Sequence, residues 1–260
     1  IRIPASLCGI VGFKPSFGRI PLEGIAPLGP TFDTLGPITR RVADARLLFC
    51  VMAGLPVPET GAGKVLHVGV PAIDQLAPCD PEVLANFERS IEALRLAGHK
   101  VEIFSFPMEF TAYQALNGSI VAHDAYRQHQ SLAEDAATPL DPHVRQRILA
   151  GRDIDDARYA ALLQECAAAM SEFSSGWARF DIMALPSTPL PAVPVDMVDE
   201  STFPMSRYTR AGNCLDLCGI SIPNGITATG LPTGLQLMSW SGADAQLLDF
   251  AEQVSQGISR

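Results

Sequence analysis

A β-α-β pattern in the first half of the chain places the strongest constraint on its fold. Residues 65–70 and 101–104 are short apolar runs typical of strands. Between them, Asp80 and Pro81 form an N-cap with proline at the first helical position, and Gly98 follows as the C-cap. A helical crossover of this length joins parallel strands, so the sequence predicts an α/β fold.

The remaining segments fit into the same domain. Residues 1–37 are rich in Gly and Pro. This composition predicts tight loops and brief strands near a site, and no helix. Thr39 is expected to cap a helix that continues to Met52 and ends before Gly54. Further elements are expected as a helical excursion over residues 109–180, strands at 181–185, 220–223 and 233–239, and a helix at 243–254. We therefore expect one domain with a mixed central β-sheet flanked by helices.

The composition argues against two classes of partner. A chain of 260 residues with 47% hydrophobic and 18% charged residues can bury a globular core. Its formal net charge of -9 makes a nucleic-acid partner improbable and favours a small neutral or cationic substrate. The longest apolar stretch, residues 47–52, is far shorter than the roughly 20 residues of a membrane-spanning helix, so no membrane partner is expected.

Cysteine and histidine give no sign of a metal or cofactor. The six cysteines are scattered without zinc-site or redox spacing, and we interpret them as packing thiols. The five histidines form no HExxH motif and are interpreted as neutral surface residues. We expect no metal and no cofactor. The absence of a secretory signal leads us to expect a cytoplasmic location.

Five sequence blocks together resemble one known family. In chain order they are IRIPASLCGIVGFKPSFGRIPLEGI, FDTLGPITRRVADARLLFCVMAG, MALPSTPLPA, NCLDLCGISIPNG and GLPTGLQLM. They are similar to the amidase signature family immediately downstream of its nucleophilic serine. The resemblance implies that residues 1–260 are the C-terminal portion of a single amidase signature domain, with a sheet that is incomplete at its N-terminus.

The resemblance also implies a reaction. The family hydrolyses amides with a serine nucleophile, a second serine next to a cis peptide bond and a lysine base, and all three would precede Ile1. A lysine that takes the proton of a serine through a second hydroxyl makes that serine nucleophilic enough to attack an amide. The full-length protein is thus expected to be an amidase that releases ammonia or an amine. The fragment itself has no catalytic residues and is expected to be inactive.

Other functions remain open at this point. The Leu-Asp-Leu sequence after Asn213 is closer to family branches that act on allophanate or biuret. A glutamyl-tRNA amidotransferase A-like subunit would instead deliver ammonia to a partner. A noncatalytic binding chain is a third alternative. For an enzyme, the expected partner is a small-molecule amide, and a homodimer is possible.

Three residues are candidates for the site. Arg2 matches the family's arginine, and the resemblance implies that it supports the nucleophile loop by pairing with an upstream carboxylate; the alternative is a solvated chain end. Tyr208 and Arg210 lie in a polar stretch before a predicted strand and are expected to bind substrate or to have a structural role. Arg207 is the fallback for Arg210, and Asn213 is expected to pin a helix.

Two other polar residues are interpreted as structural. Lys14 lies close to Ser16 and Ser6, but a catalytic dyad requires a hydrogen bond between hydroxyl and amine, and a proline-broken loop does not fix that geometry. Asp33, between Phe32 and Thr34, could act as an acid or base, but a turn in which its side chain binds local backbone explains the sequence better.

Overall fold

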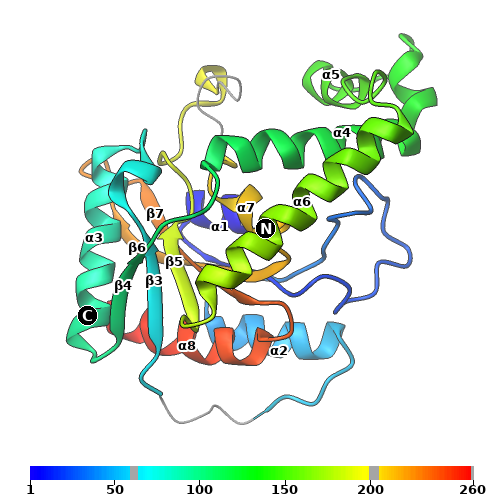
Figure 1. The fold of residues 1–260 in the computed structure, drawn as a ribbon. Helices are drawn as coiled ribbons and strands as arrows, with labels where there is room; N and C mark the ends of the chain where they lie inside the picture. Colours follow the sequence, from blue (N-terminus) through cyan, green and yellow to red (C-terminus); the bar gives the residue numbers. More distant parts are fainter. Residues whose placement is uncertain (59–63, 199–204, 259–260) are drawn as a thin grey trace.

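A mixed β-sheet runs through the middle of the protein (Figure 1). The computed structural model describes residues 1–58, 64–198 and 205–258. The strands are β1 (Val11–Lys14), β2 (Ile38–Thr39), β3 (His67–Pro71), β4 (Lys100–Phe104), β5 (Ile182–Pro186), β6 (Leu217–Ile226) and β7 (Pro232–Trp240). Their order is β2-β1-β6-β7-β5-β3-β4. Strands β5, β3 and β4 are parallel and the other pairs are antiparallel, which confirms the predicted mixed sheet.

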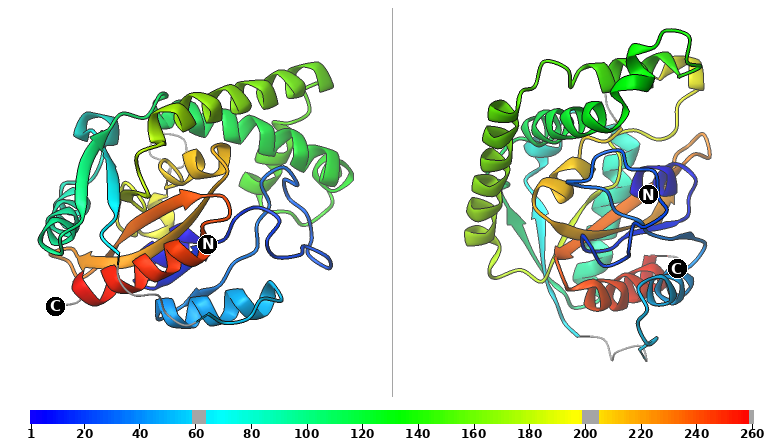
Figure 2. Two further views of the ribbon diagram at one scale, coloured as in Figure 1. Left: turned by 60° about the horizontal axis from the view of Figure 1, so that its bottom comes forward. Right: turned by 90° about the vertical axis from the view of Figure 1, so that its right-hand side faces the viewer.

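Helices cover both faces of this sheet. They are α1 (Arg2–Leu7), α2 (Val42–Met52), α3 (Pro81–Leu96), α4 (Phe110–Glu134), α5 (Pro142–Leu149), α6 (Asp156–Trp177), α7 (Thr209–Cys214) and α8 (Asp244–Ile258), with short 3-10 turns at Ile73–Leu76 and Val195–Met197. Helices α3 and α8 pack on one face, and α2 packs against α8. Helices α1 and α7 lie on the other face, where α4 and α6 cross above them and α5 stands away from the sheet (Figures 1 and 2).

The predicted β-α-β unit is present. Strands β3 and β4 are parallel and are joined through α3. The carboxylate of Asp80 accepts hydrogen bonds from the backbone N–H groups of Glu82 and Val83, which have no partner within the helix. Gly98 follows the helix with a φ of +89°, a left-handed conformation that glycine adopts at little cost. Local capping residues therefore determined both ends of α3.

An aromatic cluster holds the helical excursion against the sheet. Phe104 at the end of β4 makes edge-to-face contacts with Phe173 and Trp177 of α6 and with Phe180, at ring-centroid distances of 5.4, 6.2 and 5.6 Å. All four side chains are buried. Aromatic pairs in this geometry each contribute roughly 0.5–1.5 kcal/mol beyond the burial of their area. This packing fixes α6, which in turn forms one wall of the second cavity described below.

Two expectations for the first 40 residues were wrong. A helix, α1, forms where none was expected; Pro4 falls in its first turn, where a missing N–H removes no helical hydrogen bond. Thr39 does not cap α2, because it lies in β2 and its hydroxyl donates to the backbone oxygen of Arg41. Helix α2 begins at Val42 and ends as predicted, with Gly54 in the left-handed conformation.

Within the described part of the chain, none of the helices combines the length and the apolar character that crossing a membrane would require.

Candidate functional site

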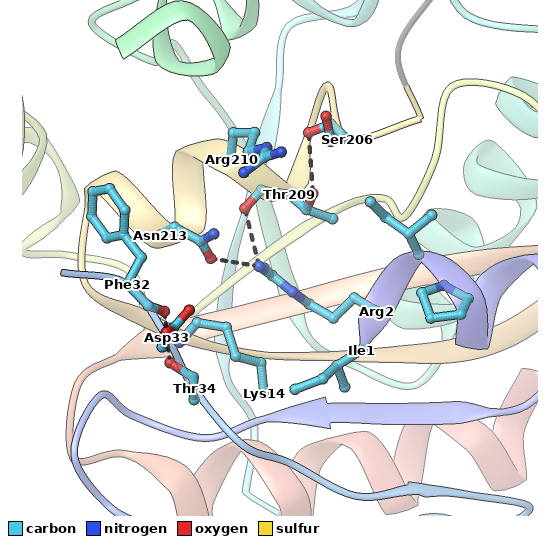
Figure 3. Close-up of a pocket in the computed structure, with 12 residues that line it drawn as sticks. Ile1, Arg2, Lys14, Phe32, Asp33, Thr34, Ser206, Thr209, Arg210 and Asn213 are labelled. Atoms are coloured by element: carbon cyan, nitrogen blue, oxygen red, sulfur yellow. Dashed lines mark hydrogen bonds between the residues drawn. The ribbon is translucent and has the colours of Figure 1, made fainter. Parts of the chain in front are cut away.

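A cavity of about 310 Å³ opens beside the first turn of the chain, between α1, residues 32–34 and α7 (Figure 3). It is lined by Ile1, Arg2, Ile3, Pro4, Lys14, Phe32, Asp33, Thr34, Ser206, Thr209, Arg210 and Asn213. These residues come from segments that are distant in the sequence and are brought together on one face of the sheet. A concave site with several convergent polar groups is the usual form of a small-molecule site.

Arg2 forms the floor of the cavity and is not the solvated chain end considered above. Its side chain is 5% exposed. The guanidinium donates to Gln236 Oε1 at 2.8 Å, to the backbone oxygen of Thr209 at 3.0 Å and to Asn213 Oδ1 at 2.9 Å. Burial, with a smaller contribution from the charge of Arg210, lowers the pKa of Arg2 to about 10. Arg2 thus ties α1 to α7 and β7 through neutral oxygens within the chain.

Two glycines make room for this guanidinium. A Cβ on Gly212 would lie 2.9 Å from Arg2 Nη1, and a Cβ on Gly219 would lie 3.1 Å from the same atom. Both distances are shorter than an ordinary van der Waals contact. The close packing of α7 and β6 against Arg2 therefore depends on glycine at both positions.

The two predicted substrate-binding residues occupy different environments. Arg210 lines the cavity and donates to Asn117 Oδ1 of α4 at 2.5 Å. Tyr208 is fully buried, packs edge-to-face on Phe110 at 5.2 Å, and donates its hydroxyl to the backbone oxygen of Leu76 at 2.5 Å. This placement does not support a substrate contact for Tyr208, whose phenol anchors the start of α7 in the core.

The fallback residue Arg207 also lies outside the cavity. Its guanidinium donates to the backbone oxygen of Ala77 at 2.5 Å, and the residue is 8% exposed. Arg210 is therefore the arginine of this stretch that lines the cavity. Asn213 lines it too, and its side-chain oxygen accepts from Arg2 instead of capping a helix.

Lys14 adds a third cationic group to the cavity wall. Its side chain is 7% exposed and donates to the backbone oxygen of Pro15 at 2.9 Å. Burial, followed by the charge of Arg2, lowers the pKa of Lys14 to about 8. The carboxylate of Asp33, which also lines the cavity, accepts through Oδ2 from the backbone N–H groups of Leu28 and Gly29 at 2.8 and 3.1 Å. The turn interpretation of Asp33 is therefore confirmed.

The perturbed pKa of Lys14 leads to a measurable pH dependence of stability. Between pH 8 and 10.5, the unfolded chain keeps a proton that Lys14 has lost in the folded protein, so the free energy of unfolding should rise with pH. The full difference is about 3 kcal/mol. Urea unfolding measures the free energy of unfolding of each variant. The value for Lys14→Met minus the value for wild type should decrease by about 3 kcal/mol between pH 7.5 and 10. Lys64→Met removes an exposed lysine and is the control; its free energy of unfolding should differ from that of wild type by the same amount at every pH. The same behaviour in Lys14→Met would contradict the prediction.

The loop that carries Asp33 is held by the helical excursion through a Thr31 latch, formed by Thr31, Asp124 and Tyr159. The backbone N–H of Thr31 donates to Asp124 Oδ2 of α4 at 3.0 Å, and the hydroxyls of Thr31 and Tyr159 of α6 are 2.7 Å apart. His129 of α4 also contacts the backbone oxygen of Pro27 at 2.5 Å. Helices α4 and α6 therefore position residues 32–34 at the cavity.

Opening the Thr31 latch should loosen this loop. Tyr159→Phe removes one hydrogen bond worth about 1 kcal/mol, so amide hydrogen exchange in residues 28–35 should accelerate about fivefold. Hydrogen-exchange mass spectrometry measures this directly. Tyr126→Phe is the matched control, because its hydroxyl donates to Glu134 away from the loop. Equal exchange of residues 28–35 in both variants would show that Tyr159 does not hold the loop.

No serine–lysine hydrogen bond is present in the part of the chain that the structure describes. Ser16 donates to Asp244 Oδ2 at 2.7 Å, and Ser6 Oγ lies 3.4 Å from Thr188 Oγ1. Ser187 and Ser221 bond to each other at 2.7 Å. Lys14 bonds to Pro15, as given above, and Lys100 pairs with Glu102. The structural interpretation of Lys14 and Ser16 is consistent with this geometry.

One histidine is buried, contrary to the surface interpretation. His123 is 6% exposed and stacks on the ring of Tyr159 at 3.9 Å, beside the latch. Asp124 Oδ1 and Asp156 Oδ1 lie 3.6 and 3.8 Å from its ring nitrogens. Across residues 1–58, 64–198 and 205–258, no three His, Cys, Asp or Glu side chains gather in a way that could hold a metal ion.

Sequence reasoning missed the partners of Arg2. Gln236 is fully buried in β7, and Thr209 contributes a backbone oxygen. No local pattern could have revealed either contact, because they join positions 234 and 207 residues apart. The one available signal was a glutamine between Leu235 and Leu237 in a predicted strand, since a buried polar side chain requires a hydrogen-bonding partner.

Two named proteins show what this sequence is similar to. The chain is 31% identical to 2-amino-5-chloromuconic acid deaminase of Comamonas testosteroni, over 96% of this chain and 57% of that protein. It is 28% identical to a subunit of the glutamyl-tRNA(Gln) amidotransferase of Geotalea daltonii, over 98% of this chain and 61% of that polypeptide. The chain thus spans about three-fifths of the length of these relatives.

Two solved structures show which known folds this chain superposes on. A crystal structure described as an amidase superposes with a TM-score of 0.90 at 30% identity, covering 99% of this chain and 60% of that one. Allophanate hydrolase of Kluyveromyces lactis superposes with a TM-score of 0.86 at 20% identity, covering 98% of this chain and 44% of that one, which shows a shared fold alone. The sequence model of the Amidase family matches residues 1–248, and the chain therefore belongs to the amidase signature family.

Proposed function

We propose that the protein hydrolyses the amide bond of a small substrate that carries a carboxylate. Family membership and the relatives named above support amide hydrolysis. The observation that carries the substrate class is the placement of Arg2, Lys14 and Arg210 on the wall of one cavity of about 310 Å³. A site of this volume admits a small molecule and excludes a folded polypeptide.

The positive cavity changes the expectation drawn from composition. The net charge of -9 suggested a neutral or cationic substrate. Net charge describes the field of the whole molecule, whereas recognition depends on the groups that face the ligand. Around the cavity, Asp33 is engaged by backbone N–H groups, and the buried cations Arg2 and Lys14 line the same cavity as Arg210. An anionic group on the substrate would lower the electrostatic cost of burying these charges together.

In this proposal the chain supplies the substrate-binding side of the active site. The serine nucleophile, the bridging serine, the lysine base and the oxyanion loop belong to residues that precede Ile1 in the longer protein. The nucleophile attacks the carbonyl carbon, the amine or ammonia leaves, and water then hydrolyses the acyl-enzyme. Arg2 fixes α1, and with it the position of Ile1 beside the cavity. Arg210 orients the substrate carboxylate.

An assay of paired substrates tests this proposal. The longer protein that contains this chain is offered small amides that differ only in carrying a carboxylate or a neutral group of similar size. We expect ammonia release with kcat/KM at least about tenfold higher for the carboxylate member of each pair. Equal rates would contradict the substrate class, and the absence of release from every amide would contradict the hydrolase assignment.

An amidotransferase component is the second candidate, supported by the curated relatives that carry that name. Such a component would release ammonia from glutamine, and its glutaminase activity would depend on a stable complex with a partner polypeptide. Copurification of the protein with a second polypeptide, together with turnover limited to glutamine, would favour this candidate. Turnover of several small acidic amides by the protein without a second polypeptide would favour the simpler hydrolase.

A further inference from the structure

Two thiols meet in the wall of a second cavity, where α6 packs against α7. Cys166 of α6 donates its S–H to the backbone oxygen of Cys214, the last residue of α7, at 3.1 Å. Cys214 donates its own S–H to the backbone oxygen of Tyr113 at 3.7 Å. Both cysteines line a cavity of about 230 Å³. This cavity shares Lys14, Phe32, Thr34 and Asn213 with the one described above.

We propose that Cys166 and Cys214 form a reversible oxidation site, in which hydrogen peroxide converts the two thiols into a disulfide that joins α6 to α7. The pair differs from the other cysteines in placement. Cys166 is partly exposed in a cavity large enough for peroxide, and Cys214, which lines the same cavity, is buried. The two lie 48 positions apart in the sequence, so only the fold brings them together.

The environments of the two thiols suit two different chemical roles. In the thiolate form of Cys166, the Cys214 S–H would turn from the Tyr113 oxygen to the sulfur of Cys166, and this hydrogen bond lowers the pKa of Cys166. The same hydrogen bond, with burial, raises the pKa of Cys214. A thiolate reacts with peroxide, whereas a thiol does so poorly. Cys166 is therefore the attacking sulfur and Cys214 the resolving sulfur.

The oxidation proceeds in two balanced steps. The Cys166 thiolate attacks one oxygen of hydrogen peroxide, the O–O bond breaks, and hydroxide leaves, which oxidises the sulfur to a sulfenic acid. The Cys214 sulfur then attacks the Cys166 sulfur, the S–O bond breaks, and water leaves with the thiol proton. In total, two thiols and one peroxide give one disulfide and two waters. A dithiol reductant reverses the reaction.

Peptide mapping of the peroxide-treated protein tests this assignment. We expect a linked peptide pair that contains Cys166 and Cys214, lighter by two hydrogen atoms than the separate peptides and absent after treatment with dithiothreitol. Cys50→Ser, which removes a buried cysteine of α2, should leave this crosslink intact. In Cys214→Ser, the sulfenic acid of Cys166 should persist and react with dimedone.

The wild-type map alone is sufficient to overturn the proposal. Recovery of Cys166 as a sulfinic acid with Cys214 still reduced would show that Cys214 does not resolve the intermediate. Oxidation of the exposed Cys8 while Cys166 and Cys214 both stay reduced would show that the pair is not reactive. A crosslink from Cys166 to any other cysteine would contradict the assigned partner.

Discussion

Residues 1–260 produced alone are expected to hydrolyse no amide at a rate above background. The described residues hold no serine–lysine hydrogen bond, and Lys14 and Ser16 are each engaged elsewhere. Loss of the nucleophile or its base typically costs on the order of 10⁴-fold or more in kcat. Here the proposed nucleophile, base and oxyanion donors would all be missing together, while the cavity wall remains.

The measurement compares this polypeptide with the longer protein on the same panel of small amides. The blank is the longer protein with alanine in place of the serine that is proposed to precede Ile1 directly. We expect residues 1–260 to match the blank on every substrate. Turnover above the blank would place a nucleophile within this chain, and Ser6 of α1, which lies beside Thr188, would be the first residue to substitute.

Arg210→Lys is expected to weaken turnover of carboxylate-bearing amides specifically. A guanidinium presents two parallel N–H groups to a carboxylate, and the single ammonium of lysine cannot reproduce that geometry. The loss should be about 10- to 100-fold in kcat/KM for the carboxylate member of a substrate pair. For the neutral member, a change of less than about threefold is expected, since both side chains keep a positive charge at the cavity.

Arg207→Lys is the matched control for this experiment. Arg207 lies three positions earlier in the same segment, but its guanidinium donates to Ala77 and does not line the cavity. Its substitution should leave the ratio of the two rates unchanged. If Arg210→Lys lowers both rates equally, then the hydrogen bond to Asn117 has a structural role and Arg210 does not recognise the carboxylate.

The parts of the fold that depend on local signals were predictable. Asp80, Pro81 and Gly98 define α3 because their effects act within a few residues, and the strands on either side follow from their apolar runs. Helix α1 was missed because the density of Gly and Pro outweighed a short helical turn that is stabilised by packing on β1, β6 and β7. Tertiary contacts, and not local propensity, decide such short elements.

The candidate site was less accessible to sequence reasoning. Arg2 and Arg210 were named from the sequence and line the cavity. The core position of Tyr208 became apparent only from the hydrogen bond between its hydroxyl and Leu76. The burial of Lys14 and of His123, and the meeting of Cys166 with Cys214, depend on elements that pack together from distant parts of the chain. Sequence patterns report the periodicity of one element and carry no information about which elements face one another.

The anchoring of Arg2 has a consequence for the order of assembly. Its three oxygen partners lie more than 200 positions later in the sequence, on α7 and β7. During synthesis the segment around Ile1 leaves the ribosome long before these partners exist. Its contacts with α7 and β7 can form only after both of these elements have been synthesised. A nucleophile attached to this segment would therefore lack this anchor in every chain that ends before β7, so the protein would become active only when β7 is in place.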